Sequence, residues 1–81
     1  MSRIEKDYLL RLLEEAKVGE LHMSRDGSVW GSNMPQLKKA TAANLKASGY
    51  TSKVPNGNGM WYDLELTESG EAMLAKLRNK A

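Results

Sequence analysis

The chain of 81 residues contains no cysteine and a single histidine, His22. Without cysteine it forms neither a disulfide nor a thiolate metal site, and one histidine leaves only carboxylates as further metal ligands. The carboxylates are not clustered in a way that suits a metal ion. We therefore expect no metal and no cofactor, and interpret His22 as a surface or turn residue.

The sequence also lacks a long apolar run. A membrane-spanning helix needs about 20 consecutive apolar residues, and no segment approaches that length. The first residues, MSRIEKDY, are charged and lack the apolar stretch of a signal peptide. We expect no membrane contact and a reducing, cytoplasmic setting.

Apolar residues make up 41% of the chain and charged residues 27%, which is ordinary for a soluble globular protein. The length predicts a single domain over residues 1–81. His22, Ser24 and Asp26 lie close in sequence, but a catalytic triad needs a pocket, and so small a domain spends its core on packing. We expect the protein not to be an enzyme.

Acidic residues are missing from one long segment. Residues 36–54 carry four lysines and no carboxylate, whereas residues 55–69 carry three carboxylates and no basic residue. Such asymmetry is typical of a localised anion-binding face.

Three helices are predicted. The first begins at a Ser2/Glu5 capping box, carries an apolar stripe at spacings of three and four, and ends before Gly19. The second spans residues 34–48. Its signals are the Asn33/Gln36 cap spacing, a proline in the first turn and the terminating Gly49. Rotation from Leu37 places on the exposed face Pro35, Lys38, Lys39, Ala42 and Lys46.

The third helix is capped by Thr67 and runs to about Asn79. Before it, residues 50–66 alternate in polarity around PNGNG, which predicts a two-stranded hairpin. Tyr62 and Trp61 should face opposite sides of that hairpin. Residues 20–33 are ambiguous, because they suit a short extra strand or a helical turn. Their apolar side chains are expected in the core: Leu21, Met23, Val29 and Trp30.

Two segments, LKASGYTSKV and MWYDLELTESGEAML, resemble the winged helix-turn-helix regulators of the MarR and PadR type and small phage-associated winged-helix proteins. The resemblance covers residues 34–77. It implies an α+β winged-helix fold of three helices and a two-stranded wing at 50–66. The wing tip here carries Lys53 where the family commonly has arginine.

The resemblance further implies a transcriptional regulator that binds double-stranded DNA, with helix 34–48 as the recognition helix. Gln36 and Lys38 would reach base edges, and Lys39, Lys46 and Lys53 would hold phosphates. Ala42 would lie on the same DNA-facing surface.

A second hypothesis uses the same fold as a protein-interaction module, a homodimer or a partner-binding domain without DNA binding. Its main evidence is Trp61, which shares a strand face with Asp63 and Glu65. This tryptophan is expected either to anchor an interface or to cover Lys53 in a cation–π contact.

Overall fold

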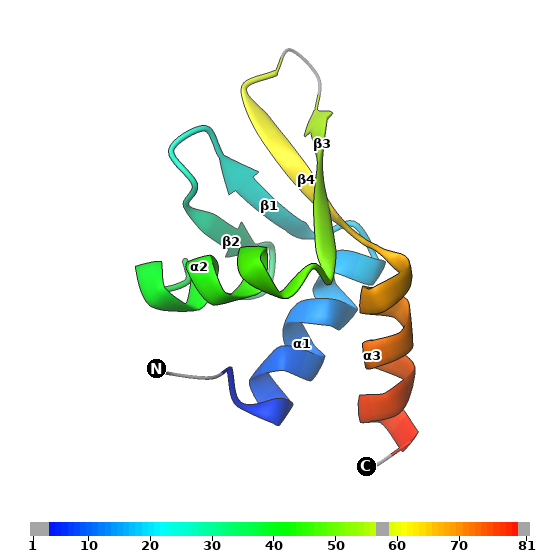
Figure 1. Cartoon of the computed structure of the whole chain (residues 1–81). Coiled ribbons are helices and arrows are strands. Elements are labelled where there is room, and N and C mark those ends of the chain that lie inside the picture. Colours follow the sequence, from blue (N-terminus) through cyan, green and yellow to red (C-terminus); the bar gives the residue numbers. More distant parts are fainter. Residues whose placement is uncertain (1–3, 57–58, 80–81) are drawn as a thin grey trace.

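The computed structural model describes residues 4–56 and 59–79, which form three helices and a four-stranded antiparallel sheet (Figure 1). The α+β class is therefore confirmed. The elements follow in the order α1 (Lys6–Lys17), β1 (Leu21–Ser24), β2 (Val29–Gly31), α2 (Lys39–Ser48), β3 (Thr51–Asn56), β4 (Trp61–Leu66) and α3 (Glu68–Asn79).

The sheet is larger than the two-stranded wing that was predicted: the hairpin at 50–66 is present, but residues 20–33, which were left ambiguous between a strand and a helical turn, supply two further strands. The sheet order is β2-β1-β4-β3, and His22 of β1 lies opposite Asp63 of β4. An Asp26-Gly27 turn joins β1 to β2, and Gly27 has a φ of 95° that favours glycine. Buried and half-buried residues alternate along both strands. This period of two residues is typical of a strand, and the alternative of a helical turn in residues 20–33 is not observed.

Helix α1 presents Leu12, Leu13 and Ala16 to the core and ends at Lys17, two residues before Gly19, whose φ is 77°. Ser2 of the predicted capping box lies outside the described residues. Glu5 is the N-cap and makes no side-chain capping bond.

The second helix is shorter than predicted, beginning at Lys39 instead of residue 34. Residues 34–38 run extended beside β2, where the Leu37 N–H donates to the Val29 carbonyl at 2.8 Å. The Asn33 amide donates to Glu20 Oε2 at 2.9 Å, and Asn33 caps no helix because the N-cap of α2 is Lys38. Pairing with the edge of β2 thus outweighs the local helix-start signals. The C-terminal prediction is confirmed, since Gly49 caps the helix in the left-handed conformation.

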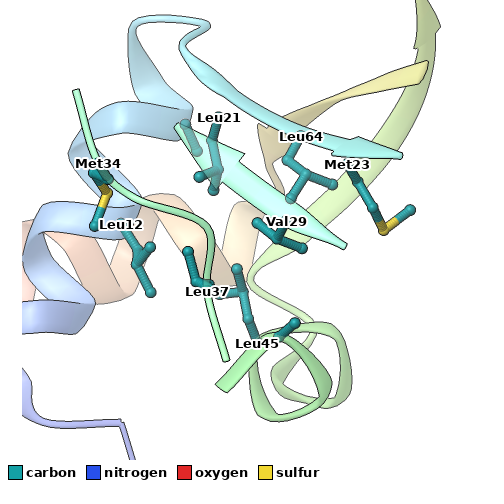
Figure 2. Packing of buried hydrophobic residues seen from close by; sticks show 10 residues of the cluster. Leu12, Leu21, Met23, Val29, Met34, Leu37, Leu45 and Leu64 are labelled. Carbon is teal, nitrogen blue, oxygen red and sulfur yellow. The ribbon is translucent and has the colours of Figure 1, made fainter. Parts of the chain in front are cut away.

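The main core lies between the sheet and helices α1 and α2 (Figure 2). Its central side chains come from every layer: Leu12, Leu21, Met23, Val29, Met34, Leu37, Leu45 and Leu64. A smaller cluster joins α1 to α3 through Leu13, Leu74 and Leu77. Leu21, Met23 and Val29 are buried as predicted, whereas Trp30 is only half-buried and lies on the other face of the sheet.

The start of α3 is held against the end of α2. Thr67 caps the helix as predicted, because its hydroxyl oxygen accepts the Gly70 N–H at 3.1 Å. The same hydroxyl donates to the Gly49 carbonyl at 2.6 Å, and the Thr67 N–H donates to the Tyr50 carbonyl at 3.0 Å. None of the three described helices has the length and apolar character needed to cross a membrane.

Candidate functional site

The residues predicted to bind DNA do not lie on one helix face in the structure. Gln36 and Lys38 are exposed but precede α2, in the extended segment 34–38. Lys39 and Lys46 are exposed on α2 itself. These two lie seven residues apart, so they share one flank of the helix about 10 Å apart along its axis.

The placement of Ala42 on the exposed face is wrong, because only 4% of this residue is accessible and it belongs to the main core. The predicted exposed face was defined by its angle from Leu37 around the helix axis, but Leu37 does not lie in the helix. Counted within α2 alone, Ala42 is three residues before Leu45 and shares its buried side.

Lys46 and Lys53 line one open groove together with a third cation, Arg25. Lys46 comes from the last turn of α2, Lys53 from β3 and Arg25 from the β1–β2 turn. The groove has a volume of about 430 Å³ and is lined by Met23, Arg25, Asp26, Gly27, Lys46, Thr51, Lys53 and Leu64. Three elements distant in sequence thus form one basic surface, hereafter the basic groove.

The β1–β2 turn presents Arg25 from a well-bonded loop. The Asp26 carboxylate accepts hydrogen bonds from the Ser24 hydroxyl and from the Ser28 N–H, the latter at 2.9 Å. These bonds, that of Ser24 first, lower the pKa of Asp26 to about 2. Asp26 is therefore ionised at neutral pH, and the groove carries three positive charges against one negative charge, a net of +2.

The three cations make no salt bridge with a carboxylate anywhere in the described part of the chain. The Lys53 ammonium lies over the Tyr62 ring, 4.9 Å from its centroid, so the second of the two alternatives for Trp61, a cation–π contact with Lys53, is wrong. Lys53 sits opposite Leu64, on the Tyr62 face of the hairpin, and Trp61 points to the other face. Because none of these cations is paired with a carboxylate and Asp26 offsets only one of the three charges, the groove keeps a net positive charge that attracts an external anion.

The Lys46 ammonium lies against the β1–β2 turn. A β-carbon built on Gly27 would stand only 2.6 Å from Lys46 Nζ. Glycine at this position therefore permits both the turn and the close approach of the lysine.

The opposite face of the sheet is acidic and aromatic. His22 Nδ1 contacts Asp63 Oδ1 at 2.7 Å, and the Asn56 amide donates to Asp63 Oδ2 at 2.8 Å. The bond from Asn56, followed by that with His22, holds the pKa of Asp63 below its usual range. His22 is thus a half-buried strand residue, not the surface or turn residue that was expected, and its ring packs 5.7 Å from that of Trp30.

Trp61 lies on this same face and is 40% exposed, and its neighbour Val54 is 37% exposed. In the described residues, no group of three histidine or carboxylate side chains is placed to hold a metal ion.

Arg25 is the site residue that sequence reasoning missed. Its one local signal is its position before the Asp26-Gly27 turn, which predicts an exposed side chain at a hairpin tip. Nothing in the sequence indicates that this tip lies beside the lysines of residues 36–54, since β1 is placed by its pairing with β4.

Comparison of the chain with protein-family models, with curated proteins and with solved structures gives no significant match.

Proposed function

We propose that this protein is a small winged-helix protein that binds double-stranded DNA and regulates transcription. The observation that carries the proposal is the basic groove, in which Arg25, Lys46 and Lys53 converge without carboxylate partners among the described residues. Unpaired cations clustered on one face are the electrostatic footprint of a nucleic-acid-binding surface.

The arrangement of elements supports the winged-helix part of the proposal. Hairpin β3–β4 directly follows α2 and extends past the helices, as a wing does beside a recognition helix (Figure 1). The helix that normally precedes the recognition helix is replaced by β2 and the extended segment 34–38. In this protein the orientation of α2 therefore depends on the β2 edge.

The surface of α2 suits contact with a duplex. Its exposed side carries three alanines, Ala40, Ala43 and Ala47, flanked by Lys39 and Lys46. Small side chains let a helix approach the floor of the major groove while flanking lysines bind phosphates. Lys38 and Gln36, exposed just before the helix, remain the candidates for base contacts.

The test is fluorescence anisotropy with a random-sequence duplex at several salt concentrations. With three to five phosphates neutralised, log affinity should fall with log salt with a slope of about −3 to −5. The double variant Lys39→Ala/Lys46→Ala should flatten the slope by about 2, because two phosphate contacts are lost.

The matched control is Lys6→Ala/Lys76→Ala, which removes the same charge from exposed positions of α1 and α3. Equal weakening by the two double variants would mean that only net charge matters and would contradict the proposed surface. Absence of binding at about 50 mM salt would refute DNA binding itself.

Exposure of Trp61 favours a second candidate function, a protein-interaction module that pairs through the acidic and aromatic sheet face. Tryptophan at the centre of an interface commonly dominates binding energy, and Trp61 is half-exposed beside Val54. Analytical ultracentrifugation should then show a dimer that Trp61→Ala dissociates. A protein that is monomeric at every concentration would exclude the homodimer.

A further inference from the structure

We infer that the basic groove is a binding site for a phosphate monoester carried on a small apolar group. The groove lies between α2, the β1–β2 turn and hairpin β3–β4. Its volume of about 430 Å³ falls within the range of roughly 300–1,000 Å³ that is usual for small-molecule sites.

The lining of the groove is divided by chemistry. Met23 and Leu64 are 7% and 3% exposed, and both belong to the main core. Figure 2 shows these two side chains on neighbouring strands, with Leu45 of α2 on the same side of the sheet. They lie at the base of the groove, and the aliphatic stems of Lys46 and Lys53 with the methyl group of Thr51 complete an apolar floor, whereas the charged ends of Arg25, Lys46 and Lys53 supply the charge. A bare inorganic anion would leave that floor uncovered.

The charge selects the anion. The net charge of the lining, three cations less Asp26, is +2, and a phosphate monoester carries about −1.5 to −2 at pH 7. A carboxylate would neutralise only half of that charge. Arginine binds phosphate oxygens in a bidentate fashion and lysine binds them as a point charge, and the Thr51 hydroxyl adds a neutral hydrogen-bond donor.

Asp26 does not block the anion from the site. Its carboxylate is occupied by hydrogen bonds from Ser24 and Ser28, which hold it within the turn. Nor is Lys53 sequestered, because a cation above an aromatic face keeps its N–H donors available on the side away from the ring.

Occupation of the groove would neutralise Lys46 and Lys53, so ligand and duplex would weaken each other's binding by the same factor. This regulatory consequence rests on the proposed function, whereas the ligand site does not.

The experiment is a titration of the isotope-labelled protein followed by amide NMR shifts, with three probes: phenyl phosphate, inorganic phosphate and phenol. Phenyl phosphate should shift the amides of Gly27, Lys46 and Thr51, and should bind about tenfold more tightly than inorganic phosphate because its ring covers the apolar floor. Phenol should bind at least tenfold more weakly than phenyl phosphate. Arg25→Gln and Lys46→Gln should each weaken phenyl phosphate binding several-fold, and the control Lys76→Gln should not.

Several outcomes would overturn the inference. Shifts confined to other parts of the surface would exclude this groove, and equal affinity for phenyl phosphate and inorganic phosphate would exclude the apolar contribution. Equal affinity for phenol and phenyl phosphate would exclude a contribution of the phosphate charge to binding. Anisotropy on the same samples separates the two proposals: a protein that binds duplex but not phenyl phosphate refutes this inference alone. One that binds phenyl phosphate but not duplex refutes the proposed function alone.

Discussion

Replacing Gly70 by alanine tests the packing of α3 against the end of α2. Gly70 is a buried residue in the first turn of α3. Helix propensity alone predicts that Gly70→Ala stabilises the protein by about 1 kcal/mol. The structure predicts the opposite, because a β-carbon at this position would stand 2.0 Å from the Tyr50 carbonyl oxygen and 3.1 Å from Leu66 Cδ2.

The magnitude follows from what must move. Overpacking of this kind costs about 1–3 kcal/mol, and contact with backbone puts the cost at the upper end. The same carbonyl accepts the Thr67 N–H at 3.0 Å, and losing that hydrogen bond costs about 1 kcal/mol more. After subtracting the propensity gain, we expect a loss of about 2–3 kcal/mol. A protein of this length has a stability of only about 4–12 kcal/mol.

Thermal unfolding followed by circular dichroism measures the effect. A loss of this size should lower Tm by about 10 °C or more, since 1 kcal/mol corresponds to about 4–8 °C in small domains. The control is Ser69→Ala, one residue earlier on the exposed side of α3, which should change Tm by no more than a few degrees. A Gly70→Ala protein as stable as the parent would refute the close approach of α3 to Tyr50.

Three further predictions concern single side chains. Thr67→Ala should lower stability by about 1 kcal/mol in urea unfolding, because the cap of α3 is lost, whereas Thr67→Ser should retain most of it. Ala42→Lys should unfold the protein in circular dichroism because Ala42 is buried, whereas Ala43→Lys, on the exposed side, should be tolerated; equal tolerance would contradict the burial of Ala42. Asp26, with a pKa of about 2 when folded and an ordinary value of 3.8, stabilises the fold above about pH 4 and loses this contribution as the pH falls toward 2. Asp26→Asn should therefore be less stable than the parent at pH 6, and the difference in Tm should narrow between pH 4 and pH 2. A difference independent of pH would contradict the lowered pKa.

Parts of the site followed from local signals and parts did not. The exposure of Lys38, Lys39, Lys46 and Lys53 is confirmed, because long charged side chains avoid the interior of a small protein. The face assigned to Ala42 is wrong, since alanine is accepted equally well on either side of a helix and its burial depends on which side of α2 packs against the core. Leu37, from which that side was inferred, pairs with Val29 and does not lie in the helix.

The elements whose signals act over a few residues are predictable from the amino-acid sequence. These are the apolar stripe of α1, the stop at Gly49, the hairpin of residues 50–66 and the Thr67 cap of α3. Each follows from the apolar spacing, the conformational freedom or the hydrogen-bonding groups of one short segment.

Two features depend on long-range contacts: residues 34–38 run extended, and Arg25 joins Lys46 and Lys53 around one groove. The physical reason is the same in both cases. An edge strand and a hairpin turn are placed by backbone hydrogen bonds to partners distant in the chain. Leaving these backbone groups unpaired costs more free energy than the local helix-start signals of residues 33–36 provide.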